Sequence, residues 1–157
     1  MPDAQAAHEK TMSSLLVALA GANVIYGMGM LDGGMTWSHE QLVIDNDIVK
    51  MVKHVIKGID VNDETMAVDI IKQAHEIRDF LRQEHTVRHM RSKPQPKLFD
   101  RTTRGTWETR GSRDLLGKAR DEAHRIIETH QPEPLRDDVK KIIREIITDA
   151  ATELVPA

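Results

Sequence analysis

Cysteine is absent from the 157 residues of this chain. Its absence excludes disulfides, thiolate metal ligands and cysteine nucleophiles, and it is typical of proteins in a reducing compartment. Aromatic residues are also scarce, at 3% of the chain against 39% for all hydrophobic residues. We therefore expect a core of Leu, Ile, Val, Met and Ala, which favours helices packed on helices or on a sheet.

Long apolar runs and long runs of one charge are missing as well. The longest apolar run, residues 15–20, is far shorter than the roughly 20 residues that cross a bilayer. The first ten residues, MPDAQAAHEK, lack the basic and apolar segments of a signal peptide. With 22 Lys and Arg against 25 Asp and Glu, the chain has no basic excess for nucleic acid or anionic membranes. We expect a cytoplasmic protein without nucleic-acid or membrane partners.

What the chain does contain is mainly helical periodicity. Apolar residues recur at the 3.6-residue period between capping residues and glycines. Helices are expected from Asp3 to about Ala20, from Ser38 to Gly58, from Asn62 or Asp63 to about Ala74, over 83–91, from Ser112 or Arg113 to about Thr129, and from Asp137 onward. Residues 75–81 are compatible with a strand but too polar to assign, and 97–110 is irregular with one helical turn.

One segment departs from this helical pattern. Residues 22–26 form a nearly continuous apolar run, which predicts a short parallel strand buried on both faces. A single strand cannot satisfy its own backbone donors and acceptors. Either the strand pairs with polypeptide outside this chain, or the strand prediction is wrong.

A glycine-rich loop follows this predicted strand and leads into a helix. Gly27, Gly29, Gly33 and Gly34 permit positive φ and let a ligand approach the backbone. Barrel and doubly wound enzymes place their sites after the carboxyl ends of strands. The spacing is one residue too long for the dinucleotide fingerprint, and a flexible strand-to-helix turn is an equally good interpretation.

A second candidate site is the sequence EHTVRH, residues 84–89. On a helix, His85 and His89 share one face at i and i+4, as paired metal ligands do. Thr86 stands where the zinc-protease pattern requires Glu, and the sequence gives no third ligand. A hydrogen-bonded or solvated helix face is therefore favoured, and we predict no metal site.

Four blocks of this sequence resemble the C-terminal part of the trimethylamine methyltransferase family. They are PDAQAAHEK, LAGANVIYGMGMLDGGMTWSHEQLVIDNDIV, FLRQEHTVRHMR, and LFDR with the helix that follows; together they extend over about residues 2–135. The resemblance implies a (β/α)8 barrel and methyl transfer from a methylated amine to the cobalt of a separate corrinoid protein. The predicted fold is then α-rich α/β, with the C-terminal part of a TIM barrel at 1–92 and a helical extension at 93–157.

The resemblance also suggests which residues meet the substrate. Tyr26 would be a wall facing the amine cation, and Asp32 or Glu84 would supply a counter-charge, with His85 beside them at the barrel mouth. Glu84 is equally well explained as a charge at a helix N-terminus. The catalytic residues would lie upstream of this chain. The corrinoid would be carried by the partner, so no cofactor is bound directly, and the complete protein would be a homo-oligomer.

The expected barrel strands upstream of residue 22 are not in this sequence, so we expect a remnant of a longer protein, inactive alone. In related methanogen enzymes an amber codon that encodes pyrrolysine precedes a region like PDAQA. Reading that codon as a stop is one hypothesis for the start of this chain, which the upstream DNA would test. The alternatives are a helical module that docks on the corrinoid protein or on an upstream fragment, and a free-standing helical bundle.

Overall fold

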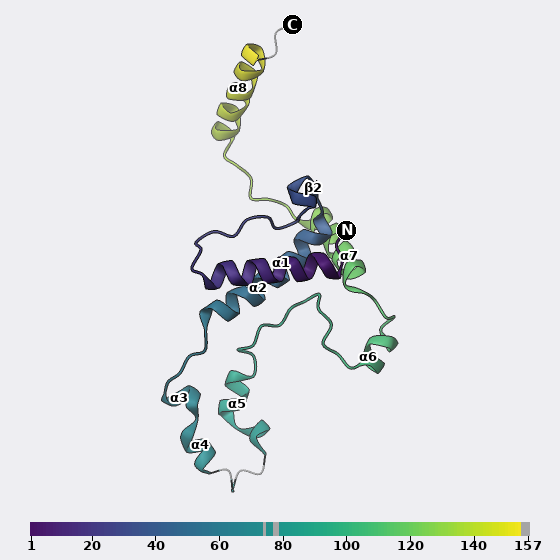
Figure 1. Ribbon diagram of the computed structural model, residues 1–157. Helices are drawn as coiled ribbons and strands as arrows, with labels where there is room; N and C mark the ends of the chain where they lie inside the picture. The colour runs from purple at the N-terminus through teal and green to yellow at the C-terminus, as the bar shows by residue number, and fades with distance from the viewer. Residues whose placement is uncertain (74, 77–78, 155–157) are drawn as a thin grey trace. The chain divides into compact units, whose positions relative to one another are not determined.

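The computed structural model describes residues 1–73, 75–76 and 79–154. In these residues the chain is mainly helical (Figure 1). The helices are α1 (Ala4–Leu19), α2 (His39–Lys57), α3 (Asp63–Met66), α4 (Val68–Lys72), α5 (Glu84–His89), α6 (Arg104–Thr109), α7 (Leu115–Thr129) and α8 (Asp137–Leu154), with 3-10 turns η1 (Asp32–Gly34) and η2 (Phe80–Arg82). The chain divides into two units after Arg125. No described helix has both the length and the apolar character needed to cross a membrane.

The ends of α1 and α2 confirm the predicted capping residues. The Asp3 side chain accepts a hydrogen bond from the amide of Ala6, and the Ser38 hydroxyl accepts one from the amide of Gln41. Both satisfy amides that have no partner within the first turn of a helix. Gly58 ends α2 at φ 77°, a conformation that glycine adopts without a steric penalty.

Residues 22–26 form no strand within this chain, and pairing of the predicted strand with polypeptide outside the chain stays a prediction. The segment belongs to no sheet and bends at Asn23, and Val24 and Tyr26 are exposed. From Asn23 to Tyr26 the backbone makes no hydrogen bond to any other described backbone group. The two strands that do form are β1 (Met30–Leu31) and β2 (Thr36–Trp37), an antiparallel pair that brackets η1. An apolar run becomes a strand only where another strand pairs with it, and the described residues offer none beside 22–26.

The helix predicted from Asn62 or Asp63 to about Ala74 is broken into α3 and α4. Asn62, one of the two residues predicted to cap it, forms a reciprocal capping box with Thr65 at its start. Ala67 then adopts a left-handed conformation at φ 50° and separates the two short helices. Nothing in the local sequence explains this break. Residue 74, at the predicted end, lies outside the described residues, as do 77 and 78 in the unassigned stretch before η2.

The core of the first unit is small and centres on α2. Its buried hydrophobic residues are Ile44, Ile48, Val52, Leu98 and Ala119. Leu15 and Ala18 of α1 pack against this cluster from one side, and Phe99 and Leu115 add to it. Segments far apart in sequence therefore meet at the inner face of α2.

Much apolar surface remains uncovered by the described residues. Leu16 and Leu19 on α1, and Val55 and Ile56 on α2, are all exposed. Exposed apolar patches of this kind mark places where other polypeptide packs. In the second unit, α8 contains no buried residue and exposes a row of isoleucines. The barrel assignment and the boundary at residue 92 stay predictions.

Candidate functional site

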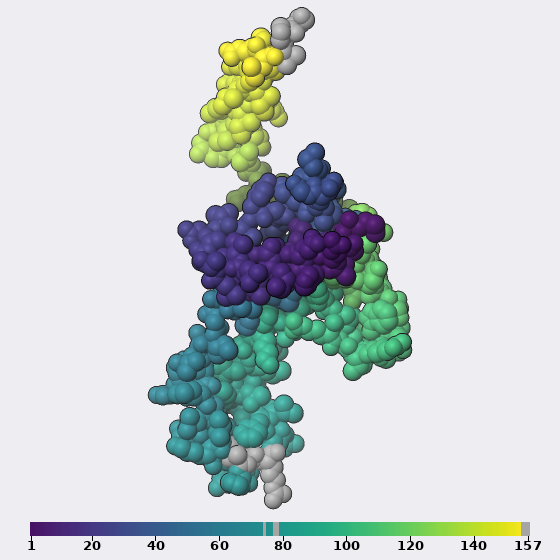
Figure 2. All heavy atoms as spheres, in the orientation of Figure 1, coloured from purple at the N-terminus to yellow at the C-terminus, as the bar shows by residue number. Residues whose placement is uncertain are grey.

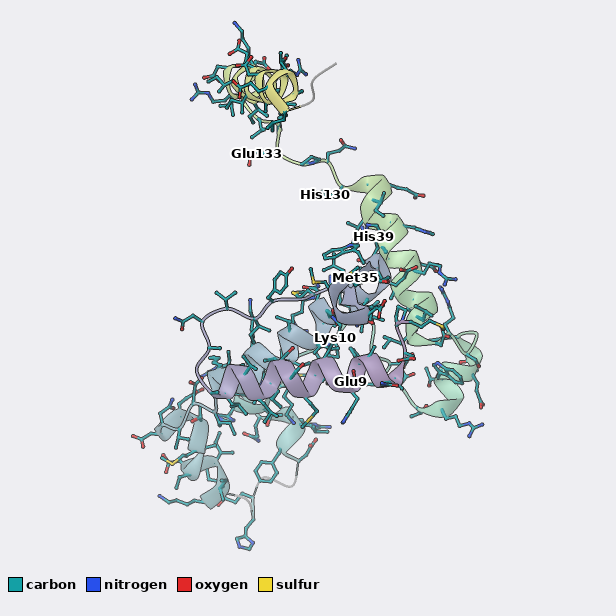
Figure 3. The ribbon with its side chains drawn as sticks, turned by 45° about the horizontal axis from the view of Figure 1, so that its top comes forward. Glu9, Lys10, Met35, His39, His130 and Glu133 are labelled. Atoms are coloured by element: carbon teal, nitrogen blue, oxygen red, sulfur yellow. The ribbon has the colours of Figure 1, made fainter. Side chains whose placement is uncertain are left out.

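A buried ion pair fixes the glycine loop to α1 and α2. The Asp45 side chain, on the inner face of α2, is only 5% exposed. Its Oδ2 accepts hydrogen bonds from Lys10 Nζ and from the Gly29 amide, both at 2.8 Å, and its Oδ1 accepts one from Gln41 Nε2 at 2.7 Å. Lys10, labelled in Figure 3, also donates to the Gly27 carbonyl at 2.8 Å. Charge-assisted hydrogen bonds therefore hold the loop at both glycines.

Gly29 is the loop glycine with the least room for a side chain. Its φ is 78°, and a Cβ added there would lie 3.1 Å from Leu42 Cβ and 3.2 Å from Trp37 Cζ2. The positive φ would strain a residue with a side chain, and an added Cβ would require Leu42 or Trp37 to shift by a few tenths of an ångström. The other predicted loop glycines, Gly27, Gly33 and Gly34, also have positive φ, but Gly33 and Gly34 lie at the exposed turn between β1 and β2.

A second buried carboxylate, Asp47, holds a distant segment. Its Oδ2 accepts hydrogen bonds from the amides of Lys97 and Leu98, at 2.7 and 2.9 Å. Lys50 Nζ approaches Oδ1 at 3.2 Å. Asp47 thereby positions Leu98 for burial against the core, so its role here is structural.

The histidine motif forms a polar cluster with α3. His85 Nε2 lies 2.8 Å from the Glu64 carbonyl oxygen, and His89 Nε2 lies 2.8 Å from Glu64 Oε1. Arg88 donates to Glu64 Oε1 at 3.0 Å and to Glu84 Oε1 at 2.8 Å. The contact with His89, followed by that with Arg88, lowers the pKa of the Glu64 carboxyl, which is therefore ionised at neutral pH.

The structure does not bring the predicted substrate residues together. Tyr26 lines a small cavity of about 60 Å³ with Lys10 and Asp45. Asp32 lines a different hollow, of about 460 Å³, beside the N-terminus of α1. Glu84 and His85 line a third, of about 330 Å³, between α3 and α5. Within the described residues the four side chains thus belong to three separate hollows, and their role in binding an amine stays a prediction.

Comparison with known proteins decides the family. The family model described as trimethylamine methyltransferase (MTTB) matches residues 1–154, which include the Asp45, Asp47 and Glu64 clusters. The chain belongs to the trimethylamine methyltransferase family. The resemblance carried by the four sequence blocks is confirmed.

Relatives in this family carry two kinds of name. Trimethylamine methyltransferase MttB of Desulfitobacterium hafniense is 43% identical over 153 residues, which are 98% of this chain and 31% of the relative. Trimethylamine methyltransferase MttB2 of Methanosarcina mazei is 47% identical over 150 residues, 96% of this chain and 30% of the relative. A glycine betaine methyltransferase of D. hafniense is 29% identical over 154 residues, 97% of this chain and 32% of the relative. The chain spans about 30% of the length of the trimethylamine methyltransferases that it matches.

Gln41, Asp45 and Glu64 are among the residues that the structure places in polar clusters and that were not predicted from the sequence. Gln41 and Asp45 lie on the same face of α2 as Ile48 and Val52, with helical spacing, and both are buried. Polar side chains within an apolar stripe were the available signal, because a buried carboxylate requires partners. Glu64 carried no such signal, because it is exposed and 21 residues before His85.

Proposed function

We propose that this chain is the C-terminal segment of a corrinoid-dependent methyltransferase. Its reaction would move a methyl group from trimethylamine, or a related tertiary or quaternary amine, to the cobalt of a partner corrinoid protein. The observation that carries the proposal is the family match over residues 1–154, together with relatives named for trimethylamine and for glycine betaine. Both substrates are methylated amines, and at neutral pH both present a cation to the enzyme.

The residues proposed to meet this cation differ in how available they are. The Tyr26 ring is exposed and makes no side-chain hydrogen bond to another described residue, so it can pack against an alkylammonium group. Asp32 is an exposed carboxylate at the turn between β1 and β2. Glu84 is already paired with Arg88 at 2.8 Å, which offsets its charge. Asp32 is therefore the stronger counter-charge of the two.

The unpaired segment 22–26 supports inactivity of the chain alone. Its backbone groups lack partners among the described residues, and its apolar side chains Val24 and Tyr26 are exposed. In the proposed complete protein this segment pairs with strands of the remaining two thirds and becomes one strand of the barrel. Lys10 and Asp45 then hold the loop that follows the strand, where barrel enzymes place their sites.

Methyl transfer can be tested by supplying the missing part in trans. The purified chain is mixed with the N-terminal two thirds of the D. hafniense trimethylamine relative, the corrinoid protein and one amine, and corrinoid methylation is followed by absorbance. Methylation is expected with both parts present and absent with the chain alone. Turnover by the chain alone would overturn the proposed inactivity. If the two parts associate and no methylated amine is consumed, the proposed reaction is wrong.

A second candidate function is a helical module that docks on the corrinoid protein. The supporting observation is α8, whose Ile142, Ile143, Ile146 and Ile147 are exposed along one face. An amphipathic helix of this kind can lie in an apolar groove of a partner. Binding of the isolated chain to corrinoid protein that is lost in Ile146→Lys, without restored methylation in the mixture above, would favour this function.

A further inference from the structure

The region from α3 to α5 has no hydrophobic core in its described residues. None of the helices α3, α4 and α5, nor the turn η2, contains a buried residue. Met66, Val68, Ile71, Phe80 and Leu81 are all exposed. This region is teal in Figure 2. Among the described residues, Glu64 of α3 interacts with His85, Arg88 and His89 of α5.

The groups at this junction are those that bind zinc. One ring nitrogen of His85, one of His89 and a carboxylate oxygen of Glu64 all lie within 4.8 Å of one another. A tetrahedral zinc ion with bonds of about 2.0–2.1 Å needs ligand atoms roughly 3.3 Å apart, so small side-chain rotations suffice. The two imidazole rings already lie close together, with centroids 4.4 Å apart. Two imidazoles and one carboxylate match zinc better than calcium or magnesium, which prefer oxygen ligands alone.

We propose that Glu64, His85 and His89 form a zinc site that joins α3 to α5. The hollow of about 330 Å³ beside Glu64 and His85 leaves room for water as a fourth ligand. Three protein ligands with water in the fourth position is the arrangement of catalytic zinc sites, whereas structural sites usually have four protein ligands. The ion would supply the cross-link that this region lacks in hydrophobic contacts, as metals do in other small structural units.

Arg88 provides a specific test of the zinc site, because its guanidinium would compete with zinc for the Glu64 carboxylate. Arg88 Nη1 lies 3.0 Å from Glu64 Oε1, but Nη2 also pairs with Glu84 at 2.8 Å. When zinc binds, Arg88 can keep Glu84 as its partner and release Glu64. Removing Arg88 should therefore strengthen zinc binding. If Glu64, Arg88 and His89 only pair with one another and bind no metal, removing Arg88 would not produce tighter zinc binding.

Zinc titration of the full chain against a chromophoric zinc indicator tests the site. One ion per chain is expected, and His89→Ala or Glu64→Gln should lower the affinity by more than about tenfold, since loss of even an outer partner of a ligand costs about 10- to 100-fold. Arg88→Ala should bind zinc more tightly. His8→Ala, which removes an exposed histidine from α1, is the matched control and should leave the affinity unchanged.

A second measurement uses the unaltered chain and does not depend on how variants fold. Diethylpyrocarbonate modifies accessible imidazoles, and peptide mapping locates the modified residues. Zinc should protect His85 and His89 and leave His8 reactive. Stoichiometric binding that survives both ligand substitutions, or the absence of protection at saturating zinc, would overturn the proposal. The outcome is independent of methyl transfer.

Discussion

Two regions of the first unit hold their helices together in different ways. In the region of α1, the glycine loop and α2, buried Ile44, Ile48 and Val52 are combined with a carboxylate, Asp45, whose two oxygens accept three hydrogen bonds. In the region of α3 to α5, the carboxylate of Glu64 makes comparable polar contacts with its side chain 47% exposed and without a buried hydrophobic residue beside it. Burial, more than the number of hydrogen bonds, should decide how much each carboxylate stabilises the protein.

Exchanging the two carboxylates for alanine tests this most directly. Asp45→Ala leaves Lys10 and the Gly29 amide without their buried partner, and we expect a loss of about 3–5 kcal/mol in the free energy of unfolding. Glu64→Ala should cost far less, and this small cost should vanish at high salt because exposed ion pairs are screened. Urea denaturation followed by far-UV circular dichroism measures both. Equal losses would remove the distinction between the two regions.

A pair of isoleucines extends the test to apolar packing. Ile48 on α2 is 2% exposed, whereas Ile71 on α4 is 61% exposed. Ile48→Ala should lower the free energy of unfolding by about 2–5 kcal/mol through lost contacts and a new cavity. Ile71→Ala should change it by less than about 0.5 kcal/mol. A large effect at Ile71 in the same denaturation experiment would show that α4 is packed in solution.

A pair of glycines separates crowding from backbone strain. Gly29 and Gly21 have similar φ values of 78° and 86°, but an added Cβ meets Leu42 and Trp37 only at Gly29. Both alanine variants pay a cost for the left-handed backbone, of about 1–2 kcal/mol. Gly29→Ala should lose about 1–3 kcal/mol more, because overpacking adds to the strain. Thermal unfolding of the two variants gives the comparison, and equal melting temperatures would mean that the loop moves away from Trp37.

The smallest effect concerns an exposed carboxylate outside both regions. Lys118 Nζ, 2.7 Å away, together with the hydroxyl and amide of Thr102, holds the pKa of the Asp100 carboxyl well below its usual range. Because the folded pKa is depressed below the unfolded value of about 3.9, this contribution is complete above that pH and is lost as the pH falls through the folded pKa. Carboxyl NMR titration should show Asp100 still ionised at pH 3.9. Lys118→Met should raise the pKa of Asp100, and an unchanged titration would rule out the pairing in solution.

The sequence predicted structural features that depend on neighbouring residues, such as helix starts, and missed contacts between residues far apart in the chain. Asp3 and Ser38 cap helices within their own first turns, so α1 and α2 begin where they were predicted to begin. The strand predicted at 22–26 does not form within this chain, because pairing needs a second strand, which the described residues do not provide there. The motif of His85 and His89 was recognised, but Glu64, which completes the cluster, lies more than 20 residues away.

The amides of Lys97 and Leu98 donate hydrogen bonds to the Asp47 carboxylate, which lies 50 and 51 positions before them in the sequence. The intervening stretch, with α3, α4 and α5, is in effect a long loop that the Asp47 carboxylate closes at its two ends. The entropic cost of closing such a loop grows only with the logarithm of its length, so doubling the length would cost roughly 0.6 kcal/mol. Homologues can therefore lengthen or shorten this stretch at little cost in free energy, provided that the hydrogen bonds from the two amides to the Asp47 carboxylate are kept.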